Sequence, residues 1–301
     1  MTRPPVLSRG AVDRASEHRR DPAWLAQAWS SRGHVLVLDD EMRAPVERNG
    51  DAAGLRLAQA AGRLPPDALF LGADADGAYF ALDQQGEPGA GSPAKKAASA
   101  ASEWAGLRDV GALLGDRDAG LLVHAVGLQT WHRSHPRCPR CGNPTEVHEG
   151  GHVRRCPSDG SEHHPRTDPA MIVLVTTPDA QKAVLGRAVG WRGRMMSCLA
   201  GFVEPGESAE QCVVREVQEE VGLAVTEVAY STSQPWPFPC SLMLAFRAVA
   251  DEAELHPDPT EISEARWVTR RELQQGIKDG GLTVPPVVSV ARRLIDDWLA
   301  A

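Results

Sequence analysis

Short apolar runs and helical periodicities alternate along the first 133 residues and predict a small α+β domain. The apolar runs predict strands at residues 34–38, 68–72 and 78–82. Asp21 followed by Pro22 predicts the start of a short helix over 23–29, and residues 116–133 have the spacing of a long amphipathic helix. The Gly-, Ala-, Pro- and Ser-rich stretch 84–101 predicts an exposed loop. With no catalytic constellation visible, we expect a scaffold or dimerisation domain.

From residue 169 onward, longer apolar strands are flanked by amphipathic helices. Strands are predicted at 171–177, 182–187, 195–203, 224–230, 241–249 and 264–268, the first two forming a hairpin. Thr269 has the position of a helix cap, and Pro285 and Pro286 precede a final helix. That helix carries one apolar stripe, made of Val290, Leu294, Ile295 and Trp298. This order predicts an α/β fold in which helices cover both faces of a mixed sheet, an α/β/α sandwich.

Residues 201–223 combine a glycine-bounded turn, a short helix and a stop. Ser208 and Gln211 fit a capping box, and Gly222 fits the position just past the helix end. A core-facing stripe is predicted from Val213, Val214, Val217 and Val221. On the neighbouring arc of about 100° lie three carboxylates, Glu216, Glu219 and Glu220. Such a run is usually a solvated face, but beside an apolar stripe a divalent cation such as Mg²⁺ or Mn²⁺ would relieve the repulsion.

Composition narrows the class of protein. A chain of 301 residues is too long for one typical core, so we expect at least two domains. Arginines and an aspartate interrupt the first residues, and no apolar run approaches a membrane span, so we expect a soluble, cytoplasmic protein. A formal net charge of −8 argues against a general nucleic-acid coat protein. Six cysteines in such a chain favour reduced thiols or metal ligands over disulfides.

A cysteine motif separates the two halves, in residues 134–168. Cys138 and Cys141 form a knuckle on a tight turn, and Cys156 follows at the spacing of a zinc ribbon. Asp159 stands where a fourth cysteine would complete the set. The alternative fourth ligands nearby are His152, His163 and His164. The motif predicts one structural Zn²⁺ per chain, with a ribbon that keeps its shape without metal as the alternative.

A second unusual stretch is 233–241, in which three prolines alternate with Trp236 and Phe238. Prolines at this density exclude a regular helix or central strand and predict a stiff extended loop. The two rings suit either a rigid core connector or a slot in which a planar base stacks.

Gly201, Glu207 and the run Arg215-Glu-Val-Gln-Glu-Glu-Val-Gly-Leu223 resemble the complete Nudix box. Downstream, Ser-Gln-Pro-Trp-Pro-Phe-Pro-Cys-Ser, ending at Ser241, resembles the signature of the NADH pyrophosphatases, a zinc-ribbon branch that also removes NAD caps from RNA. The resemblance is strong from about residue 138 onward. It implies three parts, residues 1–133, a zinc ribbon at 134–168 and a Nudix domain at 169–301, assembled as a homodimer.

The resemblance also implies roles for individual residues. Catalysis would fall to Glu216, Glu219 and Glu220, with Glu219 or Glu220 as the proton acceptor. Two or three Mg²⁺ or Mn²⁺ ions would be held by Glu216, Glu219, Glu220, Glu261 and the backbone carbonyl of Ala200. The substrate NAD(H) would contact Gln234, Pro235, Trp236, Pro237, Phe238, Pro239, Cys240, Ser241, His164 and Ala291. His164 departs from the tyrosine that the family often has there.

Two alternatives compete with hydrolysis of NAD(H) to AMP and nicotinamide mononucleotide. One is a Nudix enzyme for ADP-ribose or diadenosine polyphosphates, against which the proline-aromatic stretch argues. The other is a zinc-ribbon nucleic-acid-binding regulator with a vestigial hydrolase domain. The complete Nudix box and the negative net charge of the chain argue against such a regulator.

Overall fold

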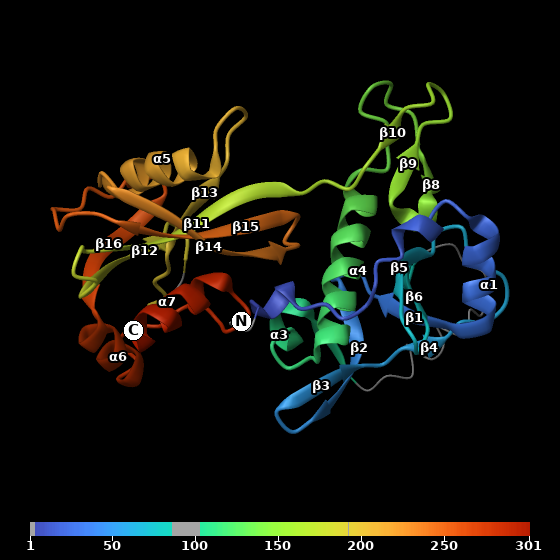
Figure 1. Cartoon of the computed structure of the whole chain (residues 1–301), viewed down its shortest axis with the longest axis horizontal. Coiled ribbons are helices and arrows are strands. Elements are labelled where there is room, and N and C mark those ends of the chain that lie inside the picture. Colours follow the sequence, from blue (N-terminus) through green and yellow to red (C-terminus); the bar gives the residue numbers. More distant parts are fainter. Residues whose placement is uncertain (1–3, 86–102, 192) are drawn as a thin grey trace. The chain divides into compact units, whose positions relative to one another are not determined.

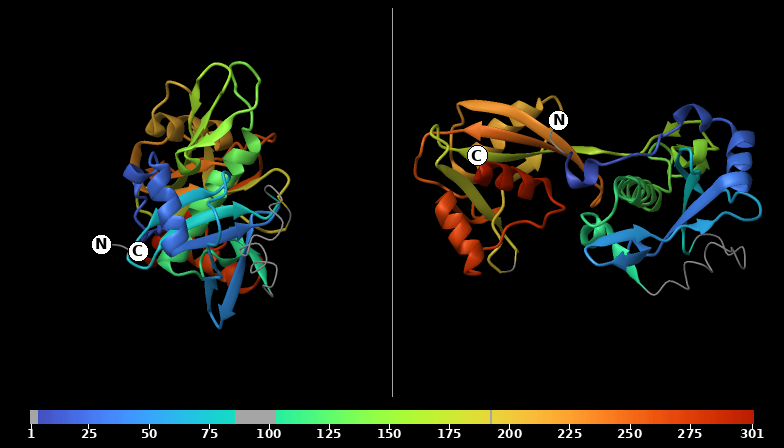
Figure 2. Two further views of the ribbon diagram at one scale, coloured as in Figure 1. Left: turned by 90° about the vertical axis from the view of Figure 1, so that its right-hand side faces the viewer. Right: turned by 60° about the horizontal axis from the view of Figure 1, so that its bottom comes forward.

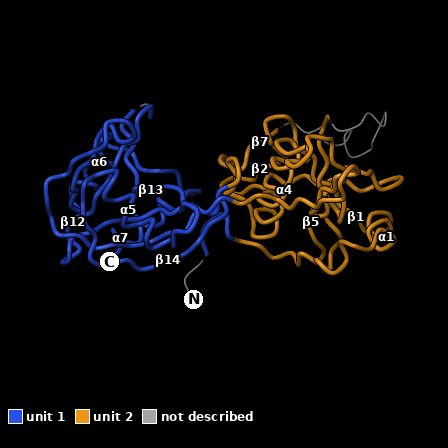
Figure 3. Tube along the Cα trace, turned by 90° about the horizontal axis from the view of Figure 1, so that it is seen from above, with its two compact units in different colours: residues 1–8, 168–236, 241–301 blue, residues 9–167, 237–240 orange. Residues whose placement is uncertain are grey.

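The computed structural model describes residues 4–85, 103–191 and 193–301, so most of the loop predicted at 84–101 lies outside the described residues. The chain divides into two compact units, which Figure 3 distinguishes by colour. Unit 1 comprises residues 1–8, 168–236 and 241–301, and unit 2 comprises residues 9–167 and 237–240. Within the described residues, no helix is both long and apolar enough to cross a membrane.

Unit 1 is built on a mixed six-stranded sheet in the order β14-β15-β11-β12-β16, with β13 also paired to β11. The central pair, β11 and β15, is parallel, and the other pairings are antiparallel. The strands are β11 (Asp168–Thr176), β12 (Lys182–Ala188), β13 (Leu199–Phe202), β14 (Glu227–Trp236), β15 (Ser241–Val249) and β16 (Ile262–Thr269). The α-helices in the described part of this unit are α5 (Ala209–Val221), α6 (Arg270–Lys278) and α7 (Val290–Ala300).

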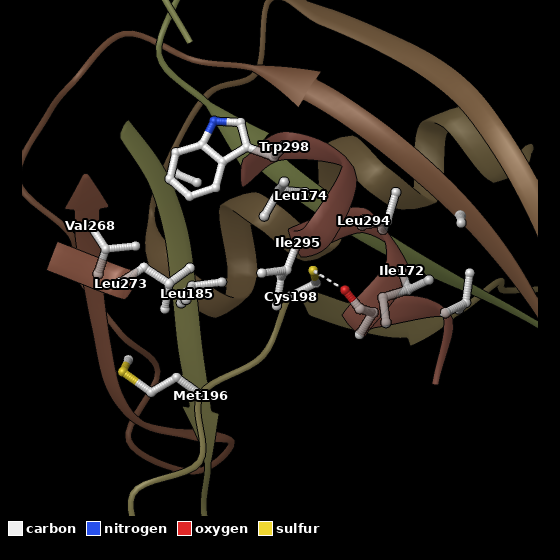
Figure 4. Packing of buried hydrophobic residues seen from close by; sticks show 14 of the residues in the cluster. Ile172, Leu174, Leu185, Met196, Cys198, Val268, Leu273, Leu294, Ile295 and Trp298 are labelled. Carbon is white, nitrogen blue, oxygen red and sulfur yellow. Dashed lines mark hydrogen bonds between the residues drawn. The ribbon is translucent and has the colours of Figure 1, made fainter. Parts of the chain in front are cut away.

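Alternation along β11 divides the core of unit 1 into two layers. Met171, Val173 and Val175 pack with the buried face of α5, whereas Ile172 and Leu174 pack with α7. The α7 layer, shown in Figure 4, includes the predicted stripe of Val290, Leu294, Ile295 and Trp298. Because successive strand residues point to opposite faces, one buried strand supports helices on both sides. The α/β/α sandwich expected from the sequence is confirmed (Figure 1).

Unit 2 contains a four-stranded sheet in the order β4-β1-β6-β5, with β1 and β6 parallel. Its strands are β1 (Gly33–Leu38), β4 (Ala58–Gln59), β5 (Leu69–Ala73) and β6 (Ala78–Asp83). A second sheet, which the apolar pattern missed, joins β2 (Arg43–Asn49) to β3 (Ala52–Leu55) and β7 (Trp104–Gly106). The predicted short helix is α1 (Pro22–Arg32), and the Asp21 carboxylate caps it by accepting from the Ala23 and Trp24 amides.

The long helix predicted at 116–133 is α4 (Asp116–Ser134), and it is buried on several sides. It packs against β5 and β6, and it can be followed from two further directions in Figure 2. Near its start, Asp118 accepts a hydrogen bond from the Leu55 amide of β3 at 2.8 Å. The short helix α3 (Leu107–Val110), the 3₁₀ turns η1 (Val6–Ser8) and η2 (Ser16–His18), and this contact were not anticipated.

The cysteine motif flanks a three-stranded sheet of unit 2, made of β8 (Glu146–His148), β9 (Val153–Arg155) and β10 (Glu162–His163), with a 3₁₀ turn η3 (Glu149–Gly151). Cys138 and Cys141 precede β8, and Cys156 directly follows β9. Side chains bind this sheet to the rest of the unit. His152 Nε2 lies 2.9 Å from the Phe70 carbonyl oxygen, and His132 Nε2 lies 2.8 Å from that of Gly151. Arg154 in turn contacts His132 Nδ1 at 2.8 Å. The ribbon is therefore packed on the N-terminal part of the chain within one compact unit.

Two strand predictions were wrong in extent. Regular pairing in the segment predicted at 195–203 covers Leu199–Phe202, because the residues before it make isolated bridges instead. The strand predicted at 224–230 begins later and runs to Trp236, so it includes the first half of the proline-aromatic stretch. A proline is tolerated there because β14 is the edge strand of its sheet.

Candidate functional site

Helix α5 carries the carboxylates of the box and is fixed at both ends as the sequence predicts. Ser208 accepts a hydrogen bond from the Gln211 amide, and the Gln211 side chain accepts one from the Ser208 amide, which completes the capping box. Gly222 ends the helix in the left-handed region at φ 73°, a conformation that glycine adopts without strain.

The buried face of α5 lies further round the helix than we expected. Val214 was predicted to face the core, but its side chain is 46% exposed. At 100° per residue the buried arc is centred on Val213 and extends the other way, to Cys212, Glu216 and Glu220. Glu216 and Glu220 are thus 8% and 6% exposed, within the buried face rather than beside it. Burial of two carboxylates requires compensation by a cation or by hydrogen bonds.

Gly201 on β13 makes room for one of these carboxylates. A Cβ atom at Gly201 would lie 1.9 Å from the Glu216 carboxylate carbon, far inside van der Waals contact. The box glycine is therefore required by the close approach of the Glu216 side chain to the β13 backbone, next to Ala200.

Arg215 is the cation that compensates part of this negative charge. It donates two 2.9 Å hydrogen bonds to Glu207, through Nε to Oε1 and through Nη2 to Oε2. Its Nη1 also donates to Glu216 and Glu219, each at 2.9 Å. The hydrogen bonds from Arg215 hold the pKa of the Glu207 carboxyl at about 2. This bidentate contact fixes Glu207 as a support for the cluster.

Glu220 lacks such compensation. Among the described residues, its Oε2 is one of few buried side-chain atoms without a hydrogen-bond partner. Burial, together with the charges of Glu216 and Glu261, raises the pKa of Glu220 to about 8, against a smaller opposing effect of the Ala200 backbone. Burial also raises the pKa of Glu216. A buried carboxylate oxygen without a hydrogen-bond partner is available to coordinate a metal ion.

Glu261 and Ala200 are brought to the same place by different segments. The loop before β16 is held to the end of α5, since the Asp258 amide donates to the Glu220 carbonyl at 3.0 Å and the Glu261 amide donates to the Asp258 carbonyl at 3.1 Å. The negative charge of Glu261 contributes to raising the pKa values of both Glu216 and Glu220. Ala200 lies on β13, one residue before Gly201, with its backbone next to Glu220.

This donor set fits a hard divalent cation. The orphaned oxygen of Glu220 and the raised pKa values of Glu216 and Glu220 are the features that a cation would relieve. In the ribbon, four Cys and Asp donor atoms lie within 4.8 Å of one another. Among the described residues, the glutamates of α5 do not form such a close group. The oxygen-only donor set suits a hard cation such as Mg²⁺, which prefers carboxylate and carbonyl oxygens and keeps several water ligands.

The predicted dinucleotide-contacting residues fall into both units. Pro235 and Trp236 end β14, and Ser241 begins β15 in unit 1, where Trp236 pairs with Ser241. Gln234, however, is 1% exposed, and both ends of its amide bind main-chain groups, the Leu7 amide and the Val288 carbonyl. Ala291 is also buried, and its carbonyl oxygen lies 3.8 Å from Cys198 Sγ.

The remaining predicted contacts, Pro237, Phe238, Pro239, Cys240 and His164, belong to unit 2. Within that unit the Arg108 guanidinium lies over the Phe238 ring, 4.2 Å from its centroid, as in a cation–π contact. His164 is exposed just after β10. Trp236 and Phe238 lie in different units, so a slot formed by both rings stays a prediction.

The ribbon brings together the four predicted zinc ligands. Cys138 Sγ lies 3.6 Å from Asp159 Oδ2, Cys141 Sγ lies 3.5 Å from Cys156 Sγ, and all four donor atoms lie within 4.8 Å of one another. Tetrahedral zinc with bonds of about 2.3 Å to sulfur separates its ligand atoms by about 3.8 Å. Hydrogen bonds from Ser161 hold the pKa of the Asp159 carboxyl well below its usual range, so this residue offers an anionic oxygen.

The three alternative histidines are outside this donor set. His152 is directed to the Phe70 carbonyl, and burial lowers its pKa to about 4. His163 Nε2 lies 3.1 Å from the Ser161 hydroxyl, which itself contacts Cys138 and Asp159, so this ring lies one residue removed from the cluster. The geometry therefore favours Asp159 over His163 as the fourth ligand.

Comparison with known proteins identifies three matching families. A NUDIX domain model matches residues 166–285, an NADH pyrophosphatase zinc ribbon domain matches 133–163, and an NADH pyrophosphatase-like rudimentary NUDIX domain matches 29–131. The NAD-capped RNA hydrolase NudC of Mycobacterium bovis is 37% identical over 310 residues, covering 98% of this chain and 95% of its own.

A human relative, NAD-capped RNA hydrolase NUDT12, is 41% identical over 197 residues, covering 62% of this chain and 43% of its own. Among solved structures, a NUDIX hydrolase from Nitrosomonas europaea aligns with a TM-score of 0.38 and 25% identity, covering 45% of this chain and 78% of that one.

Proposed function

Because the chain belongs to the NADH pyrophosphatase family of the Nudix hydrolases, we propose that it hydrolyses the diphosphate of NAD(H) to AMP and nicotinamide mononucleotide. We extend the proposal to removal of NAD caps from RNA, the activity named for the Mycobacterium bovis and human relatives. The observation that carries the proposal is the buried, unpartnered Oε2 of Glu220 within the box.

In the proposed mechanism Mg²⁺ or Mn²⁺ would be held by the carboxylates of Glu216, Glu220 and Glu261 and by the Ala200 carbonyl. A bound divalent cation supplies Lewis-acid polarisation of a phosphoryl oxygen and lowers the pKa of water. Arg215 keeps Glu207 and Glu216 in place through its 2.9 Å hydrogen bonds. Glu219, whose side chain is 58% exposed and held by the same arginine, is the better placed proton acceptor. Glu220 remains the second candidate for that role.

Substrate selection in this proposal falls to the end of β14 and the start of β15. Trp236 is partly exposed, as a ring that stacks on a base has to be. The buried amide of Gln234 indicates that this residue shapes the site through the main chain, whereas direct contact with the dinucleotide was the expectation from sequence. We further propose a cytoplasmic homodimer, with one zinc per chain in the ribbon.

The experiment is a metal-dependent turnover assay on NADH and on an NAD-capped RNA, using the parent protein and Glu220→Gln. The substitution keeps the side-chain size and removes the charge from the proposed metal site. We expect at least a ~10²-fold loss of kcat with the fold intact, because a main electrostatic contributor is lost. NADH hydrolysis by Glu220→Gln at the parental rate would refute the assignment.

The two substrates separate the finer alternatives. A higher kcat/KM on the capped RNA identifies decapping as the preferred reaction, and a higher value on NADH identifies the free dinucleotide. Turnover of ADP-ribose or a diadenosine polyphosphate with none of NADH would replace the proposed substrate class. Absence of turnover on all of these substrates would favour the nucleic-acid-binding alternative.

A further inference from the structure

The N-terminal segment of the chain is part of unit 1, although the residues that follow it belong to unit 2. Residues 4–8, here called the N-terminal strap, include the 3₁₀ turn η1 and contact β14. Leu7 is 1% exposed, and its amide donates to Gln234 Oε1 at 3.3 Å. The Ser8 hydroxyl donates to the Ser233 carbonyl at 2.7 Å. Both bonds reach the first residues of the proline-aromatic stretch.

Gln234 connects the strap to a third segment. Its Nε2 donates to the Val288 carbonyl at 3.0 Å, in the turn that leads into α7 at Val290 and Ala291. The side chain is almost completely buried, so both polar atoms of the amide are used inside the protein. One amide thus links the N-terminus of the chain, the edge strand and the start of the last helix.

The position of the strap matters because β14 is an edge strand. An edge strand is paired on one side, and its other side has main-chain groups without a neighbouring strand. Pro235 has no N–H and cannot strengthen the pairing at the point where the strand ends in Trp236. The carbonyl of Ser233, two residues before this proline, is satisfied by the strap.

We propose that the N-terminal strap and Gln234 are positioning elements of the dinucleotide site: they hold residues 233–236 in the conformation that presents Trp236 to the substrate. This inference rests on the proposed function for its substrate and assigns Gln234 a role that involves no contact with it. Loss of the strap should therefore weaken substrate binding and leave the box chemistry on α5 intact.

The test measures KM and kcat for NADH in Gln234→Met, which keeps the volume and removes both amide hydrogen bonds, and in Ser8→Ala. We expect KM to rise about tenfold in Gln234→Met and about threefold in Ser8→Ala, from the usual strength of such bonds, with kcat within about twofold of the parent. Ser8→Thr keeps a hydroxyl and should restore the parental KM. Gln275→Met is the matched control, because this exposed glutamine on α6 donates only to Asp279, the residue that caps the end of its own helix, among the hydrogen bonds seen for its side chain.

An unchanged KM in Gln234→Met and Ser8→Ala overturns the proposal. The proposal is also overturned if kcat falls while KM is unchanged, or if Ser8→Ala and Ser8→Thr lower the melting temperature equally. A second readout is independent of the substrate: amide hydrogen exchange at Ser233, Gln234 and Trp236 should be faster in Ser8→Ala than in the parent. It should keep the parental rate in Ser8→Thr and Gln275→Met. If the parent fails to hydrolyse NADH but exchange changes in this way, the proposed function fails and the positioning role stands. Unchanged exchange refutes that role whatever the substrate is.

Discussion

At the scale of single residues, Arg215 balances the charge of three box glutamates, whereas Glu220 keeps one oxygen without a hydrogen-bond partner. The spacing of Glu216, Glu219 and Glu220 placed three carboxylates together on one helix. It could not reveal that one arginine binds Glu207, Glu216 and Glu219 at once. Nor could it reveal that Glu220 is left with an unpartnered oxygen, because that depends on how α5 is buried against the sheet.

The raised pKa of Glu220 predicts how stability varies with pH in protein freed of magnesium and manganese. Folding raises this pKa from about 4.5 to about 8, mainly by burial. Between these two pH values Glu220 is protonated in the folded state and ionised in the unfolded chain. The stability that protonated Glu220 contributes is therefore fully present at low pH and is lost as the pH rises through about 8. Denaturant unfolding across this range should show a decline that is smaller in Glu220→Gln.

Mg²⁺ provides the control for this measurement. A cation bound by ionised Glu220 favours the charged form, so added Mg²⁺ should raise the midpoint more at about pH 8 than at about pH 5. The Glu220→Gln variant should show a smaller response. Identical pH profiles for the parent and the variant would contradict the view that burial of this carboxylate costs stability.

At the scale of elements, most helices and strands could be predicted, and the errors have local causes. The capping box and Gly222 fixed the ends of α5, and β15 has the predicted bounds. The inclusion of Val214 in the buried stripe was wrong because the stripe was drawn through apolar residues alone. The buried face also includes Glu216 and Glu220, so its centre lies further from Val214. The strand β2 was missed because its second half is exposed and polar and its first half contains Pro45.

Packing of α5 on β13 gives a prediction for Gly201→Ala. A methyl group there would lie 1.9 Å from the Glu216 carboxylate, so that side chain must move. We expect a 10- to 100-fold loss of kcat, approximately the cost of misplacing a catalytic group by about 1 Å. Stability should fall by about 1–3 kcal/mol, as in overpacked cores.

The control for this variant is Gly281→Ala in the same unit, where the new methyl would meet its nearest neighbour at 3.8 Å. It should retain parental activity. If Gly201→Ala loses stability but keeps kcat and its response to Mg²⁺, the close approach of Glu216 has no part in the chemistry.

At the scale of the whole molecule, the sequence predicted three parts, whereas contacts group the chain into two compact units. The cysteine spacing identified the ribbon, but its attachment to the N-terminal part depends on long-range contacts made by His132, His152 and Arg154. Single histidines and arginines carry no sequence signal for such contacts. The boundaries at 133/134 and 168/169 therefore remain our proposal for the family's three parts.

The ribbon gives the last prediction, which concerns metal content and its effect on unit 2. The donor atoms of Cys138, Cys141, Cys156 and Asp159 lie within 4.8 Å of one another, so we expect about one zinc per chain in protein purified without added metal. Elemental analysis should show its loss in Cys138→Ser and Asp159→Ala but not in His163→Ala, whose ring contacts Ser161 instead. Because the ribbon packs within unit 2, zinc loss should lower the melting temperature of that unit while Glu220→Gln keeps its zinc. Zinc retained in Asp159→Ala and lost in His163→Ala would transfer the fourth ligand to the histidine.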